Sequence, residues 1–129
     1  MKDILIIDDS STSRLYYREI LELLGCRVEE AINGLEGLEK LAGRRFDLML
    51  VDVNMPKMDG YTFLDHLRRD PEFRSVPAIM ISTEAQERDR VKAYSAGANG
   101  YIVKPVDPKE LSAVVRLATG LTHIGRKAA

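Results

Sequence analysis

The sequence lacks a second cysteine, a marked excess of either charge and any long hydrophobic run. The single cysteine, Cys26, excludes an internal disulfide and favours a reducing compartment. The formal net charge of −1 gives no electrostatic reason to expect binding to nucleic acid or to an anionic membrane. The longest early apolar run, residues 4–7, is too short for a signal peptide or a membrane span. These absences favour a cytoplasmic protein.

The composition is typical of one folded domain. The chain has 129 residues, of which 45% are hydrophobic and 30% are charged, a balance found in soluble globular proteins rather than disordered ones. This length fits one domain, which we expect to cover residues 1–120. A frayed C-terminal tail, residues 121–129, is expected to follow it, with no second domain.

Apolar runs of strand length alternate five times with segments of helical period. Strands are expected over residues 4–7, 26–31, 46–52, 78–81 and 101–103. Helices are expected after caps at Ser11 and Asn33, around residues 63–67, over about 85–96 and from Pro108. The first run is apolar at every position, which is typical of a strand covered on both faces. The pattern therefore predicts an α/β fold with a doubly wound, five-stranded parallel sheet in the flavodoxin-like order 2-1-3-4-5, with helices on both faces.

Polar side chains stand where the predicted strands end. Asp8 and Asp9 follow the first strand, Asp52 ends the third, Ser82 ends the fourth and Lys104 ends the fifth. In a doubly wound sheet these ends share one edge, and a crevice opens where the strand order reverses. We therefore expect three carboxylates, a hydroxyl and an ammonium to lie together.

Three neighbouring carboxylates repel one another unless a cation neutralises them. Mg2+ suits such a site because it uses few carboxylates, keeps water ligands and binds phosphate oxygens. An ionised aspartate can attack phosphorus to form an acyl phosphate, and Asp52 is favoured because its strand is central. Lys104 and the Ser82 hydroxyl are expected to contact the phosphoryl oxygens. The alternative is a set of solvated acids at loop starts, which is common for any single pair.

The chain resembles the receiver domains of bacterial two-component systems, most of all the stand-alone chemotaxis type without an output domain. The motifs that carry the resemblance are Asp8-Asp9 and residues 52–60, 82–85 and 100–105. The resemblance implies a signalling domain, and not an enzyme beyond its own phosphotransfer and dephosphorylation. It implies that Asp52 is the phosphoacceptor, that Lys104 contacts the phosphoryl group and that the Lys104–Pro105 bond is cis. Mg2+ would be held by Asp9, Asp52 and the backbone carbonyl of Asn54, with Asp8 acting partly through water.

The resemblance also implies a switch and partners. Ser82 and Tyr101 would form the switch pair: the hydroxyl moves toward the phosphoryl group and the ring turns inward. This would remodel the face made by the helix at 85–96, the strand at 101–103 and the last helix, for a downstream protein target. The upstream donor would be a histidine kinase, a phosphotransfer protein or a small phosphodonor, and the chain a monomer or weak dimer.

Seven further positions bear on the rate of dephosphorylation or on the partner surface. Asn54 and Glu84 are the pair of residues found at these positions in fast-decaying chemotaxis receivers. The resemblance therefore predicts a short-lived phosphoryl group. Thr83 stands where many relatives have alanine, and Val106 where close relatives often have a large aromatic residue. Three basic residues on the fourth helix suit a partner contact or, more simply, a solvated face: Arg88, Arg90 and Lys92.

Three other interpretations stay open on sequence alone. A flavin-binding protein of the same fold would need a phosphate cradle at residues 10–13, but Asp8 and Asp9 would repel the phosphate. An aspartyl phosphatase with Mg2+ usually needs a cap segment for which this chain is too short. A receiver-like module that is never phosphorylated is disfavoured by the complete set of acids.

Overall fold

The computed structural model describes residues 1–121 as alternating strands and helices. The strands are β1 (Asp3–Ile7), β2 (Arg27–Ala31), β3 (Leu48–Asp52), β4 (Ala78–Ser82) and β5 (Gly100–Val103). The helices are α1 (Ser11–Leu23), α2 (Gly34–Gly43), α3 (Gly60–Arg69), α4 (Glu87–Ser95) and α5 (Pro108–Thr119). The expected C-terminal tail lies, beyond Leu121, outside the described residues.

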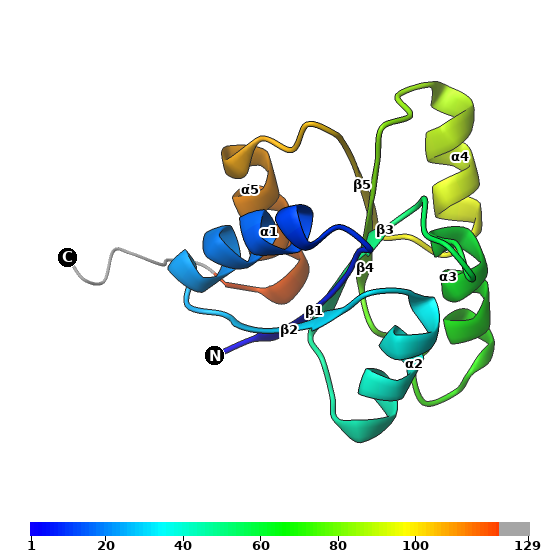
Figure 1. Ribbon diagram of the computed structural model, residues 1–129, viewed down its shortest axis with the longest axis horizontal. Helices are drawn as coiled ribbons and strands as arrows, with labels where there is room; N and C mark the ends of the chain where they lie inside the picture. The colour runs from blue at the N-terminus through cyan, green and yellow to red at the C-terminus, as the bar shows by residue number, and fades with distance from the viewer. Residues whose placement is uncertain (122–129) are drawn as a thin grey trace.

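The strands form one parallel sheet in the order β2-β1-β3-β4-β5, which confirms the predicted topology. Helices α1 and α5 cover one face, and α2, α3 and α4 cover the other (Figure 1). Strands β3 and β4 are buried at every position, as expected for central strands with helices on both sides. No helix within residues 1–121 is long and apolar enough to cross a membrane.

The core is divided by the sheet into two apolar clusters. One contains Phe63 and Leu64 of α3 with Met49 and Val51 of β3, and lies on the side of α2, α3 and α4. The other lies under α1 and α5 and includes the buried thiol of Cys26. Alternate residues of each central strand enter opposite clusters, because successive side chains of a strand point to opposite faces.

Three predicted boundaries differ from the structure. The cap of α1 is Ser10 and not Ser11, because the Ser10 hydroxyl accepts the backbone N–H of Ser13. Helix α4 begins at Glu87, two residues after the expected start, since Gln86 provides the cap. Strand β3 begins at Leu48; Phe46 is buried, but it precedes the strand.

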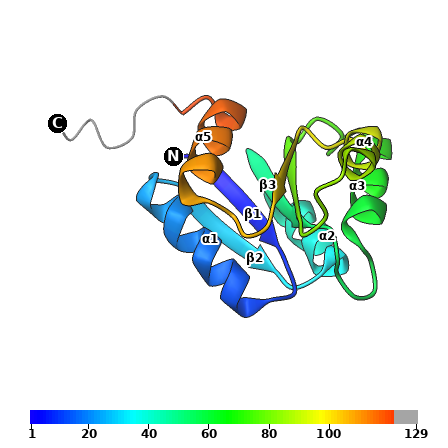
Figure 2. The ribbon, with the colours of Figure 1, turned by 90° about the horizontal axis from the view of Figure 1, so that it is seen from above.

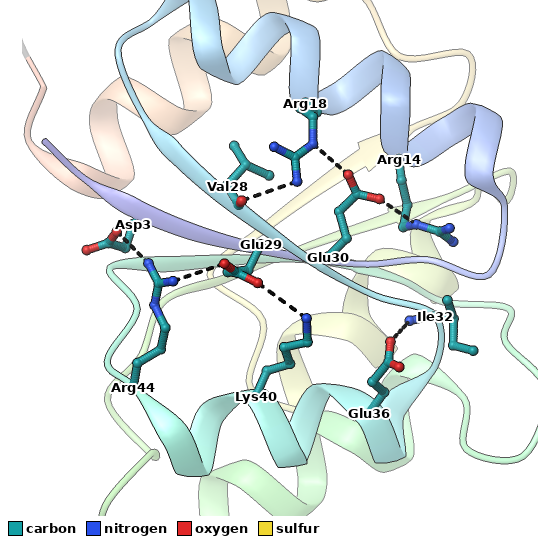
Figure 3. A network of polar contacts seen from close by, with 10 residues as sticks. All are labelled: Asp3, Arg14, Arg18, Val28, Glu29, Glu30, Ile32, Glu36, Lys40 and Arg44. Atoms are coloured by element: carbon teal, nitrogen blue, oxygen red, sulfur yellow. Dashed lines mark hydrogen bonds and ion pairs between the residues drawn. The ribbon is translucent and has the colours of Figure 1, made fainter.

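The edge strand β2 is held on both faces by ion pairs (Figure 3). On the α2 side, Glu29 accepts hydrogen bonds from Lys40 and Arg44. On the α1 side, Glu30 accepts hydrogen bonds from Arg14 and Arg18. These contacts give the charged side chains of this polar strand partners on both faces of the sheet.

Candidate functional site

The predicted site residues lie at the carboxyl edge of the sheet. Asp8 directly follows β1, Asp52 is the last residue of β3, and Lys104 directly follows β5. Strand β1 lies between β2 and β3, so the connection after β1 turns away from the one after β3. Figure 2 shows α1 on one side of this reversal and α2 and α3 on the other. A crevice at such a switch point is where doubly wound sheets bind ligands.

Three carboxylates meet in this crevice. One carboxylate oxygen each of Asp8, Asp9 and Asp52 lies within 4.8 Å of the others. Asp8 and Asp52 are buried, with 1% and 4% of their surface exposed, whereas Asp9 is exposed. The cluster therefore has two acids inside the protein and one at its mouth, so that a cation can enter from solvent.

The carboxylate of Asp8 is fixed on one side and free on the other. Its Oδ1 accepts the backbone N–H of Ser10 at 2.8 Å. Its Oδ2 is the one buried side-chain oxygen or nitrogen in residues 1–121 without a hydrogen-bond partner. A buried carboxylate oxygen without a donor is costly unless a cation or its bound water supplies the missing contact. This oxygen is thus an observation in favour of a cation site.

Lys104 is the cation that lies within ion-pair distance of both buried carboxylates. Its Nζ donates to Asp52 Oδ1 at 3.1 Å and lies 3.9 Å from Asp8 Oδ2. Its backbone N–H donates to the carbonyl of Ser82 at 2.7 Å, which fixes Lys104 beside the end of β4. The Lys104–Pro105 peptide bond is cis, as expected.

The site carries more negative charge than one lysine offsets. Burial raises the pKa of Asp52 from 3.8 to about 6, and the neighbouring Asp8 carboxylate adds to this effect, while the hydrogen bond from Lys104 opposes it. Burial likewise raises the pKa of Asp8. Oxygen ligands with excess negative charge are what a small, hard divalent cation such as Mg2+ requires, so the donor set fits that ion.

The loop after β3 is pressed against the aspartate that it follows. The backbone N–H of Gly60 donates to the carbonyl of Val53 at 2.9 Å. A Cβ at position 60 would lie 2.6 Å from the backbone oxygen of Asp52, so only glycine permits this approach. The start of α3 therefore holds the backbone of Asp52, while the Asn54 side of the loop is exposed.

Ser82 and Tyr101 contact the same peptide segment. The Ser82 hydroxyl is buried and accepts the backbone N–H of Glu84 at 3.0 Å. The Tyr101 hydroxyl donates to the carbonyl of Glu84 at 2.8 Å, and its ring is 6% exposed. The ring thus already occupies the inward position that the sequence analysis assigned to the switched state. Thr83 and the side chain of Glu84 are exposed beside it.

Sequence reasoning missed several contacts around the site. The guanidinium of Arg90 lies 5.2 Å from the centre of the Tyr101 ring, and Lys92 Nζ lies 4.5 Å from that of Tyr61. Arg88 and Lys92 are exposed, as a solvated face predicts, whereas Arg90 is half-buried against the Tyr101 ring. Arg14 donates to the backbone carbonyl of Asp8, and nothing in the sequence pattern pointed to that contact.

This topology and acid cluster define a flavodoxin-like α/β domain with an acidic pocket at its switch point. The family profile described as Response regulator receiver domain matches residues 4–116. The chain belongs to this family, a class of signalling domains in two-component systems.

Known relatives agree with this assignment. The chain is 39% identical over 119 residues to the Helicobacter pylori chemotaxis protein CheY1, covering 91% of this chain and 96% of that protein. It is 44% identical over 115 residues to the H. pylori sensor histidine kinase CheAY, covering 88% of this chain but only 14% of the kinase. The solved receiver domain of the Pseudomonas aeruginosa sensor histidine kinase PA1611, with a magnesium ion in its active site cleft, has a TM-score of 0.84. The sequence in that structure is 28% identical to this chain, and the match covers 92% of this chain and 98% of the PA1611 receiver domain.

Proposed function

We propose that this protein accepts a phosphoryl group on Asp52 and passes the signal on by changing a protein-binding surface. The observation that carries the proposal is the position of Asp52: it is buried, adjoins two further carboxylates and accepts a hydrogen bond from Lys104. Asp52 ends the central strand β3, so its carboxylate is the one with neighbours on both sides. The phosphodonor is a histidine kinase, a phosphotransfer protein or a small phosphorylated molecule.

Each site residue has a role that follows from its chemistry. Asp9, Asp52 and the backbone carbonyl of Asn54 hold Mg2+, and Asp8 acts partly through water. When bound, the ion neutralises charge on the transferred group and lowers the repulsion between the acids. Lys104 already donates to the Asp52 carboxylate, so its ammonium can donate to an oxygen of a phosphoryl group bound there. The Ser82 hydroxyl can turn away from Glu84 and donate to another phosphoryl oxygen.

The output surface in this proposal is the face of α4, β5 and α5. Ser82 and Tyr101 are the switch pair, and their shared contact with the Glu84 peptide gives a physical link between them. A hydroxyl drawn toward the phosphoryl group releases the N–H of Glu84, while the Tyr101 hydroxyl holds its carbonyl. Val91 and Tyr94, both exposed on α4, then belong to the surface read by the downstream protein. We propose that the chain does this as a monomer or weak dimer in the cytoplasm, where its free thiol, Cys26, stays reduced.

The proposal predicts that acetyl phosphate with Mg2+ labels the wild-type protein on one residue. Asp52→Asn should abolish the label, because the amide that replaces the carboxylate is not nucleophilic. Asp65→Asn is the matched control, since Asp65 is an exposed aspartate that forms an ion pair with Arg69 on α3. Intact-protein mass spectrometry measures the added phosphoryl group. An unlabelled wild type, or a label that persists in Asp52→Asn, would overturn the proposed function.

The phosphoryl group is expected to be lost within minutes. Asn54 and Glu84 are both exposed, and we propose that the attacking water passes between them along a path to Asp52. The side chain of Thr83, which is also exposed there, is expected to obstruct that path in part, so Thr83→Ala should shorten the lifetime. The measurement is the decay of label in purified phosphoprotein after the donor is removed. A half-life of hours would contradict the prediction.

A further inference from the structure

Arg14, in the first turns of α1, joins the strand-end loop of the acid cluster to the edge strand β2. Its Nη1 donates to the backbone carbonyl of Asp8 at 2.8 Å. Its Nε donates to Glu30 Oε1 at 2.8 Å, a contact drawn in Figure 3. Only 15% of its side chain is exposed. A guanidinium with two such contacts is fixed in direction, because its N–H groups form a rigid planar fork.

These contacts and one backbone hydrogen bond form a ring that includes the backbone N–H and the backbone carbonyl of Asp8. The backbone N–H of Asp8 donates to the carbonyl of Ala31 at 3.1 Å, and Ala31 follows Glu30 in β2. The backbone N–H of Asp8 is thus bonded to β2 directly, and its carbonyl is bonded to β2 through Arg14. With Oδ1 held by Ser10, Asp8 Oδ2 is the remaining free acceptor of this residue, and it faces Lys104 and the other acids.

Glu30 is in turn oriented by a second arginine that takes no part in the ring. Arg18 Nε donates to Glu30 Oε2 at 2.6 Å, while its other nitrogens donate to the Val28 carbonyl and to Glu22. Both oxygens of Glu30 are therefore occupied, which fixes the plane of the carboxylate that Arg14 meets. Arg18 is a natural control for Arg14, since it lies one turn later on the same helix and shares the same partner.

We propose that Arg14, oriented by Glu30, is a positioning residue for the metal-binding end of β1. The role rests on the proposed Mg2+ site: Arg14 holds the Asp8 peptide so that the carboxylates of Asp8 and Asp9 are in place before the ion arrives. Residues that orient metal ligands in this way typically change affinity by one to two orders of magnitude when replaced.

Electrostatics and positioning predict opposite effects of removing Arg14. The guanidinium is a cation near the site, so its charge alone repels Mg2+, and a neutral replacement would tighten binding. If Arg14 positions Asp8 and Asp9, the same replacement weakens binding, because the loop must be ordered when the ion binds. The sign of the change therefore separates the two.

The test is a titration of ¹⁵N-labelled protein with MgCl2, followed by amide chemical shifts. Arg14→Gln should raise the Kd for Mg2+ about tenfold, whereas Arg18→Gln should change it by less than about twofold. Both variants lose a contact to Glu30, so thermal unfolding should show a similar loss of stability in each. Without Mg2+, exchange of the Ser10 amide hydrogen, which is bonded to Asp8 Oδ1, should become faster in Arg14→Gln than in Arg18→Gln.

The outcomes separate this inference from the proposed function. A wild type with no saturable response to MgCl2 would overturn the proposed ion site and this role with it. A wild type that binds Mg2+, with Arg14→Gln binding equally well or more tightly, would overturn the positioning role alone. Glu30→Gln, a milder change in the same ring, should also raise the Kd for Mg2+. In the double variant with Arg14→Gln, the Kd should be no higher than in Arg14→Gln alone. Additive effects would contradict a single ring.

Discussion

Asp52→Asn is expected to raise the free energy of unfolding by about 3 kcal/mol at pH 7.5 in buffer without magnesium. The wild-type protein must bury an ionised carboxylate next to Asp8, and the pKa of Asp52 rises from 3.8 to about 6 as a result. A difference of about two between folded and unfolded pKa values corresponds to about 3 kcal/mol. Asparagine keeps the shape of the side chain and removes the charge. The variant therefore no longer has to bury an ionised carboxylate beside Asp8.

The pH dependence of this gain has a defined sign. Because the folded state binds the Asp52 proton more tightly than the unfolded state, the wild type loses stability as pH rises from about 4 through about 6. Below pH 4 both states are protonated, and the advantage of Asp52→Asn should disappear. Urea unfolding with EDTA from pH 3.5 to 7.5 measures this, with Asp65→Asn as the exposed control. A variant no more stable than the wild type at pH 7.5 would refute it.

Arg68→Ala is expected to destabilise the protein by about 3 kcal/mol. The guanidinium of Arg68 donates to the carbonyls of Gly97 and Val76 at 2.9 and 2.8 Å, and also to the Arg74 carbonyl and the Asn99 side chain. It thereby ties the loops after α3 and α4 to the amino edge of the sheet. Removing it leaves four acceptors without their charged donor, but only the carbonyls of Gly97 and Val76 are partly buried, and water can replace the donor at the two exposed acceptors. A hydrogen bond to a charged group contributes roughly 1.5–3 kcal/mol, so the two partly buried bonds account for most of the loss.

The neighbouring residue supplies the comparison for Arg68. Arg69 is 77% exposed and forms one ion pair, with Asp65, so Arg69→Ala should change stability by less than about 0.5 kcal/mol. Urea unfolding of both variants at one pH gives the difference. Since Arg68 lies at the edge of the sheet opposite Asp52, labelling by acetyl phosphate should persist in whatever fraction is folded. Equal unfolding free energies for the two variants would show that the loop contacts of Arg68 contribute little.

The fold was predictable because each level of the sequence points the same way. Runs such as Ile4–Ile7 read as strands buried on both faces, and Gly25 and Gly97 end helices at positive φ. One error occurs where two residues of the same type compete: Ser10 and Ser11 are both good caps, and the sequence does not show that the Ser10 hydroxyl is the one that accepts the N–H of Ser13. Phe46 is buried ahead of β3, and an apolar residue buried there has the same sequence pattern as one inside the strand.

The acid cluster was predictable for a topological reason, and the contacts around it were not. Parallel strands bring their carboxyl ends to one edge, so Asp8, Asp9, Asp52 and Lys104 had to lie near one another once the strand order was known. The link from Glu30 through Arg14 to the Asp8 carbonyl depends on how α1 packs across β2, which no periodicity encodes. The stacking of Arg90 on Tyr101 likewise depends on side-chain directions between two elements.

The charged edge strand has a consequence for self-association. In the five-residue strand β2, Arg27, Glu29 and Glu30 carry charges, and the two glutamates are bonded to helices on opposite faces. An incoming strand from another molecule would have to fit between the arginines and the lysine that flank β2. Concentrated solutions of this protein should therefore resist sheet-to-sheet polymerisation through β2. Removing the ion pairs of Glu29 and Glu30 is the change most suited to exposing this edge strand.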